Sequence, residues 1–267
     1  MRNPLKSNRP RAIVLALASL GTGHAGAALT VEAGDNLGGG TFEKIAYGLT
    51  GEIGQISPLL FAIDPFGSSL SGGAQPPGTQ VSGTALDFTT AVATSHGGAV
   101  VDITYAFRNT GAAGNFTDLR LLIDVQPDGS PSFSDKVSES WGAPIAGDPD
   151  RRQITDFGLS PSLSAMQTNS AATDARNDCA GACDADFGLQ WNRATLKPGE
   201  TWTVTLRLVD DPSLVTGGRY LQAVSADTAN TALIVGNAQL VPEPGTWAML
   251  AAGLGMLPLL RRRLLAA

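Results

Sequence analysis

Three segments of this chain alternate apolar and polar residues with a period of two: Val101–Arg108, Leu119–Val125 and Trp202–Leu208. Because successive side chains of a β-strand point to opposite faces, this period predicts strands that bury one face and expose the other. Turn-forming residues border each segment, at 109–111, 126–129 and 197–200. The alternation therefore predicts half-buried antiparallel strands as the basic unit of the fold.

Weaker alternation predicts further strands at Thr79–Thr90, Arg219–Ser225 and Thr231–Val241. Gly67–Gly78 is rich in Gly, Ser and Pro and is expected to form a surface loop, whereas Asp150–Asn177 is expected to be a polar insertion with a short helix. The 267 residues include 32 glycines and 16 prolines, which suits short strands joined by turns. The predicted fold class is mainly β, an antiparallel β-sandwich of immunoglobulin-like or jelly-roll-like type.

The first 27 residues have the organisation of a cleavable secretory signal. The apolar run Ala12–Leu20 follows a basic region that contains Arg2, Lys6, Arg9 and Arg11. Ala25 and Ala27 then supply the small side chains of a signal-peptidase site. The apolar run has roughly nine residues, whereas a bilayer-spanning helix needs about 20. We therefore expect a signal helix that signal peptidase removes after Ala27.

Three features follow one another at the C-terminus: Pro242-Glu243-Pro244, the uncharged apolar run Gly245–Leu260, and the basic cluster Arg261, Arg262 and Arg263. A helix over the apolar run would be about 24 Å long at 1.5 Å per residue, so it predicts a single, short transmembrane helix. The positive-inside rule places the arginines in the cytoplasm as a stop signal and the preceding chain outside. The two prolines predict an extended segment that a protease can reach.

This order of Pro-Glu-Pro, apolar run and arginine cluster resembles the PEP-CTERM sorting domain, over roughly residues 241–263. The resemblance implies that an exosortase, a membrane-embedded transpeptidase-like enzyme, recognises Pro242, Glu243 and Pro244 and cuts near them. It also implies a Gram-negative bacterium that makes exopolysaccharide and biofilm. We therefore predict a chain that is anchored transiently in the inner membrane, is cut near residue 242 and reaches the cell surface or the extracellular matrix.

Two segments of the body, 105–111 (YAFRNTG) and 196–208 (LKPGETWTVTLRL), resemble strand edges of bacterial immunoglobulin-like modules. Together with the two terminal signals, this resemblance implies three parts. These are a signal peptide at 1–27, an extracytoplasmic β-sandwich body at 28–240 and a sorting tail at 241–267.

The charge of the chain is divided unevenly between the body and the ends. The overall formal charge is −6, but seven of the 18 basic residues lie in the signal and the arginine cluster. The stretch 28–260 therefore carries 11 basic and 24 acidic residues, or about −13. Such a body lacks the basic surface that nucleic-acid binding requires, so we expect no nucleic-acid partner.

The only two cysteines, Cys179 and Cys183, are expected to form a disulfide, because the chain is exported and offers too few histidines for a zinc site. Four carboxylates surround the pair: Asp174, Asp178, Asp184 and Asp186. The spacing matches no EF-hand, so a solvated acidic loop is the main interpretation. Calcium coordination is the alternative, and no other cofactor is expected.

His96 is the sole histidine after export, and it lies in the Gly-rich segment Ser95–Gly98, where an exposed loop residue is the ordinary outcome. No Gly-x-Ser-x-Gly motif accompanies it, so we expect no catalytic residue. Trp202 is expected to pack in the core. Trp141 and Trp191 are also expected to be structural, with stacking on sugar rings as the alternative.

These patterns favour a non-catalytic surface or matrix protein that is associated with exopolysaccharide. Two alternatives remain open at this point. One is a secreted hydrolase that acts on matrix polysaccharide, because an acidic protein offers many carboxylate pairs. The other is a carbohydrate-binding or calcium-binding module.

Overall fold

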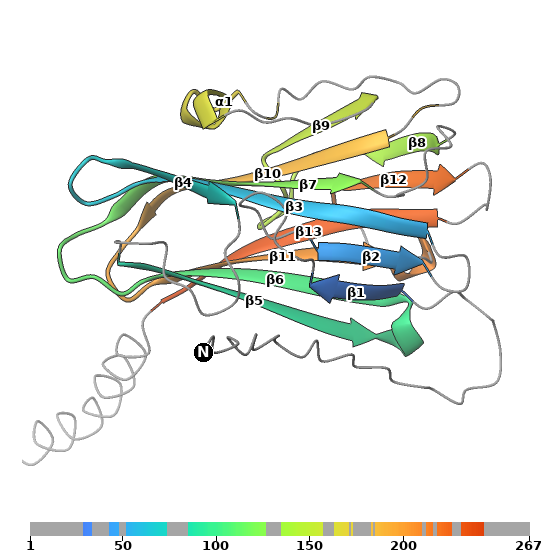
Figure 1. Cartoon of the computed structure of the whole chain (residues 1–267), viewed down its shortest axis with the longest axis horizontal. Coiled ribbons are helices and arrows are strands. Elements are labelled where there is room, and N and C mark those ends of the chain that lie inside the picture. The colour runs from blue at the N-terminus through green and yellow to red at the C-terminus, as the bar shows by residue number, and fades with distance from the viewer. Residues whose placement is uncertain are drawn as a thin grey trace, which may run out of the picture.

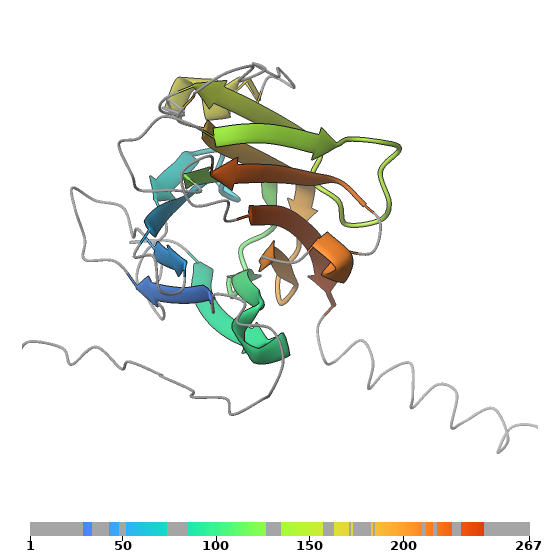
Figure 2. The ribbon, with the colours of Figure 1, turned by 90° about the vertical axis from the view of Figure 1, so that its right-hand side faces the viewer.

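The computed structural model describes residues 29–33, 43–47, 52–73, 85–126, 135–156, 163–170, 172, 183, 185–209, 212–215, 218–225 and 231–242. Within these residues the chain forms two antiparallel β-sheets that pack face to face (Figure 1). Figure 2 shows the same arrangement from the right-hand end, with the strands of both sheets gathered around one interior. The predicted antiparallel β-sandwich is therefore confirmed at the level of architecture.

We call the seven-stranded sheet A and the six-stranded sheet B. Sheet A consists, in spatial order, of β1 (Leu29–Ala33), β2 (Glu43–Tyr47), β3 (Glu52–Ile63), β7 (Phe116–Gln126), β10 (Ala185–Leu196) and β9 (Arg151–Asp156), and β4 (Ser69–Gly73) also pairs with β3. Sheet B consists, in the same sense, of β5 (Leu86–Ser95), β6 (Val100–Asn109), β11 (Thr201–Val209), β13 (Thr231–Val241), β12 (Tyr220–Ser225) and β8 (Asp135–Ser140).

The three strongest alternating segments form the central strands β6, β7 and β11. Their apolar positions face the opposite sheet and are buried, as the period of two predicts. In β11, for example, the buried positions are Trp202, Val204, Leu206 and Leu208.

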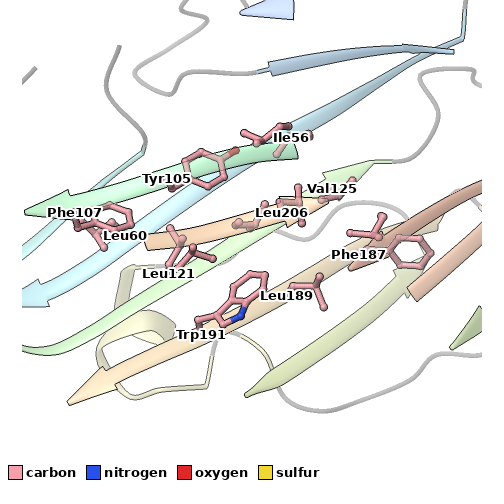
Figure 3. Packing of buried hydrophobic residues seen from close by; sticks show 14 of the residues in the cluster. Ile56, Leu60, Tyr105, Phe107, Leu121, Val125, Phe187, Leu189, Trp191 and Leu206 are labelled. Carbon is pink, nitrogen blue, oxygen red and sulfur yellow. The ribbon is translucent and has the colours of Figure 1, made fainter. Parts of the chain in front are cut away.

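The core lies between the two sheets and takes large side chains from both (Figure 3). Tyr105, Phe107 and Leu206 come from sheet B, while Leu121 and Trp191 come from sheet A. The ring of Trp191 lies against Gly236 of β13, where a side chain would collide with the indole. The indole N–H of Trp191 donates to the carbonyl oxygen of Gly147 at 3.2 Å. Trp191 and Trp202 are therefore packing residues.

Strand β7 contains a β-bulge at Asp118, whose φ of 54° lies in the left-handed region. The register of β7 against β3 shifts at this point. Phe116 and Leu119, three positions apart, are both buried in the core. The extra residue thus restores the inward direction of the apolar side chains on either side of it.

Part of the outer face of sheet A is covered by a segment that we call the cover segment, residues 163–170 and 172. It contains the short helix α1 (Leu163–Gln167). Met166 and Ala172 pack on Phe61 and Leu122, which point outward from sheet A. Two buried polar side chains hold the segment in place. The guanidinium of Arg120 donates to the carbonyl oxygens of Met166 and Gln167, and the amide of Gln190 donates to Asn169 Oδ1 at 2.6 Å.

Two sequence-based expectations need correction. Gly67–Gly78 is not only a loop, because Ser69–Gly73 forms β4, whose main chain pairs with β3. The stretch 150–177 is not wholly an insertion, because Arg151–Asp156 forms β9 at the edge of sheet A. In both cases, a neighbouring strand supplies the hydrogen bonds, which composition alone does not reveal. The short helix expected in this region is confirmed as α1.

The other boundaries vary in accuracy. Strands β12 and β13 lie where they were expected, and β5 begins at Leu86 rather than at residue 79, with residues 79–84 outside the described part. The expected signal helix and transmembrane helix also lie outside the described residues. No helix among the described residues is long and apolar enough to cross a membrane.

Asn109 ties the β6–β7 connection to the β10–β11 connection at one end of the sandwich. The residue is fully buried, and its side-chain N–H groups donate to the carbonyl oxygens of Gly114 and Leu196 at 2.9 and 3.0 Å. Its main chain accepts from the N–H of Gly199 and donates to the carbonyl oxygen of Glu200. The two segments that resemble immunoglobulin-like strand edges therefore meet through this asparagine.

We expect Asn109→Ala to lower the free energy of unfolding by about 2–3 kcal/mol, because carbonyl groups that now accept from the side chain would lose their donor. Urea denaturation followed by tryptophan fluorescence measures the change. Asn115→Ala, at an exposed position in the same loop, is the matched control and should leave the midpoint unchanged. Equal midpoints for the two variants would contradict the role given to Asn109.

Candidate functional site

The outer face of sheet B carries polar side chains, in contrast to the covered face of sheet A. On β6 and β11 the outward positions form two cross-strand pairs, Thr104 with Thr205 and Asp102 with Arg207. The threonine hydroxyl oxygens lie 3.1 Å apart. The guanidinium of Arg207 donates two hydrogen bonds to Asp102, at 2.7 and 2.9 Å. These four side chains form the floor of a groove.

The electrostatics of the floor are balanced within the sheet. The hydrogen bond to Asp102 is the main cause that raises the pKa of Arg207 above its usual value, although partial burial acts against it. The side chain of Arg207 is 48 % exposed and that of Asp102 is 24 % exposed. The pair is therefore fixed in geometry and still reachable from solvent.

Two connecting segments rise beside the floor and form the walls of the groove. One contains Ile145 and Asp148, and the other contains Leu214, Val215 and Arg219. Leu214 and Val215 pack on an outer apolar cluster of sheet B, so this wall is anchored. Ile145 is 59 % exposed and offers an apolar surface to solvent. The remaining lining residues are Ala93, Gly218, Val235, Gly236 and Asn237.

The groove has a cavity volume of about 520 Å³, within the range of small-molecule sites in proteins. Its walls are partly apolar, and its floor offers hydroxyl, carboxylate and guanidinium groups. Both carboxylates in the groove already accept hydrogen bonds, Asp102 from Arg207 and Asp148 from the main-chain N–H of Ile145 at 2.9 Å. The arrangement is suited to binding a ligand through hydrogen bonds.

Trp141 lies behind one wall of the groove. Its ring contacts the guanidinium groups of Arg152 and Arg219, whose carbon atoms lie 4.9 and 4.7 Å from the ring centroid. Arg152 also pairs with Glu139, which joins edge strand β9 of sheet A to edge strand β8 of sheet B. Trp141 therefore helps to close the sandwich and to position Arg219.

The second polar site is a pair of carboxyl groups on the outer face of sheet A. Asp124 on β7 and Asp186 on β10 share a side-chain hydrogen bond, and Asp186 is only 1 % exposed. The adjacent Thr155 stands opposite Asp186 in the register of β9 and β10. Among the described residues, neither Asp124 Oδ1 nor Thr155 Oγ1 makes a hydrogen bond.

Burial is the main cause that raises the pKa of Asp124 to about 10, and the hydrogen bond and negative charge of Asp186 act in the same direction. Asp124 is therefore protonated at neutral pH and can donate to Asp186. Two carboxyls in hydrogen-bond contact are closer than the roughly 5 Å that separates the carboxyl groups of retaining glycosidases. Their geometry does not match that of a glycosidase pair.

The structure places some of the sequence-predicted residues. His96 is exposed in a short 3₁₀ turn (His96–Gly98), and its Nδ1 lies 3.1 Å from the hydroxyl of Ser95. Cys183 is buried, and no cysteine in the described part of the chain is free. Cys179 lies outside that part, so its pairing with Cys183 stays a prediction.

Of the four aspartates considered for calcium, only Asp186 lies among the described residues. Asp174, Asp178 and Asp184 lie outside the described residues. Asp186 is hydrogen-bonded to Asp124, a residue that was not predicted from the sequence. The two lie 62 positions apart, and only strand pairing brings them together. The described residues contain no group of three or more potential metal-ligating side chains.

Among the terminal signals, only Pro242 lies within the described residues, directly after β13. Glu243, Pro244, the three arginines and the signal-peptidase site at Ala25 and Ala27 lie outside them. The groove itself was not predicted. Its floor residues read in the sequence as the solvent-facing half of two alternating strands, and this alternation is the only signal that points to them.

No protein-family model, no curated protein and no solved structure matches this chain.

The raised pKa of Asp124 predicts a pH-dependent stability. An aspartate with the ordinary pKa of 3.8 in the unfolded chain and about 10 in the folded chain binds a proton only in the folded state between these values. Its contribution to stability is therefore complete at acidic pH and is lost as the pH rises. Relative to Asp124→Asn, the wild-type protein should lose about 1.4 kcal/mol for each pH unit in this window. Urea denaturation of both proteins from pH 5 to pH 9 measures the difference, and parallel profiles would contradict the assignment.

Proposed function

We propose that this chain is an exported, exosortase-processed protein of the cell surface or biofilm matrix, and that its non-catalytic β-sandwich body associates with exopolysaccharide. The groove on sheet B is the observation that carries the binding part of this proposal. It combines an exposed polar floor with apolar walls, and these are the two properties that a sugar polymer, with its hydroxyl groups and C–H faces, can use.

The position of the last strand supports the processing part of the proposal. Strand β13 ends at Val241, and its residues 233–241 pair with β11. The Pro-Glu-Pro segment begins at the next residue. A cut near residue 242 would therefore leave both sheets complete and would release the body without loss of a strand.

Two other classes are weaker candidates. A secreted hydrolase would need reactive groups in an accessible site, but the Asp124–Asp186 pair is buried and the groove carboxylates are held in hydrogen bonds. A calcium-binding module would rest on the acidic loop around Cys179 and Cys183. An immunoglobulin-like or jelly-roll-like connectivity also stays a prediction, since sheets of seven and six strands are larger than the seven-stranded immunoglobulin constant fold.

Removal of residues 243–267 should leave the stability of the body unchanged, because every described strand is retained. Removal of residues 237–267 should destabilise it, because the end of β13 would no longer pair with β11. Urea denaturation of the two truncated proteins compares these outcomes. A large loss of stability on removal of residues 243–267 would show that the tail is part of the folded unit.

Localisation of an epitope-tagged chain in its host, with and without the exosortase, tests the proposed function directly. We expect a released form that begins after Ala27 and ends near residue 242, retained in the polysaccharide-rich matrix fraction. Intact-mass analysis of that form defines both ends. An intact arginine-rich tail on the released protein, or free diffusion into the medium, would overturn the proposal.

A further inference from the structure

The groove on sheet B has no net charge. Its charged lining residues are two carboxylates and two guanidinium groups: Asp102, Asp148, Arg207 and Arg219. A site that recognises an anionic polymer usually presents unpaired basic groups, as phosphate-binding and carboxylate-binding sites do. The balance found here points to an uncharged ligand.

Each basic group is also engaged within the protein. Arg207 makes both of its contacts with Asp102 in a bidentate pair. Arg219 donates to the carbonyl oxygen of Pro149 at 2.8 Å and lies over the ring of Trp141. A carboxylate on a ligand could reach only the remaining N–H groups of Arg207, whose positive charge Asp102 already balances.

The net charge of the body also favours an uncharged ligand over an anionic one. The stretch 28–260 carries about −13, so its long-range field repels a polyanion at low ionic strength. A neutral polymer does not experience this repulsion. The paired arginines of the groove and the net charge of the body therefore both favour an uncharged ligand.

The hydroxyl groups of a sugar polymer, in contrast, can form further hydrogen bonds with the floor of the groove. Each threonine hydroxyl can take part in more than the single Thr104–Thr205 contact. The groove crosses the strands from Ala93 on β5 to Asn237 on β13. Three strand spacings correspond to about 14 Å, long enough for a short stretch of a polymer rather than for a single small solute.

We propose that this groove binds an uncharged polysaccharide and discriminates against polymers that carry carboxylate groups. The inference rests on the proposed function, which names exopolysaccharide without its chemical class. Binding would depend on the paired hydroxyls of Thr104 and Thr205 and on the Asp102–Arg207 pair.

Affinity electrophoresis of the purified full-length chain in detergent tests the inference. The gels contain either neutral polymers (dextran, soluble starch, galactomannan) or uronate polymers (alginate, hyaluronan). We expect retardation by at least one neutral polymer and by neither uronate polymer. The double substitution Thr104→Val with Thr205→Val should weaken binding about tenfold or more, because it removes both hydroxyls with little change of shape. Thr203→Val, on the same face of β11 but outside the groove, should bind as the wild type does.

The possible results separate this inference from the proposed function. Preference for alginate or hyaluronan would overturn the neutral-ligand assignment. Equal loss of binding in the Thr203→Val control would overturn the assignment of binding to the groove. Both results would leave the association with exopolysaccharide standing. Retardation by no polymer would also overturn the neutral-ligand assignment, provided that the protein is still retained in the matrix fraction of its host. Loss of that retention would overturn the proposed function itself.

Discussion

A sheet face that carries apolar side chains has to be covered, and this constraint decides how the parts of the molecule are used. Packing of sheets A and B against each other covers the two inner faces and leaves two outer faces. The outer face of sheet A presents Phe61 and Leu122, which lie under the cover segment. The outer face of sheet B presents threonines and an ion pair around its middle. Only the outer face of sheet B can stay exposed to solvent at a low cost in free energy, and the groove lies on that face.

Burial on the outer face of sheet A has consequences for its polar residues. Arg120 and Gln190 point outward, become buried and satisfy their donors on the cover segment. Asp124 and Asp186 lie on the same outer face, where burial keeps a proton on the pair. Buried polar groups of this kind fix one arrangement of a covering segment, because displacing it would leave donors and charges without partners. The groove on sheet B, in contrast, meets solvent with its polar groups already paired.

The links between the sheets also shape the groove. Trp191 of sheet A packs on Gly236 and donates to Gly147, so it holds the 145–148 segment against β13. Trp141 holds Arg219, and the Arg152–Glu139 pair joins the edges of the two sheets nearby. Trp191 and Trp141 therefore hold the groove walls in position through these contacts. Their effect on a ligand is indirect, through the position of the walls.

The sequence by itself determined the class of fold and three of the inner strands. A period of two depends only on which face each side chain takes, so β6, β7 and β11 could be recognised without their neighbours. Strands β4 and β9 could not, because their composition is that of a loop and only pairing with β3 and β10 makes them strands. The same reason explains the missed sites. Asp102 meets Arg207 across 105 residues, and Asp124 meets Asp186 across 62, so strand order and register, which are properties of the tertiary structure, decided which polar residues became a groove and which became a buried pair.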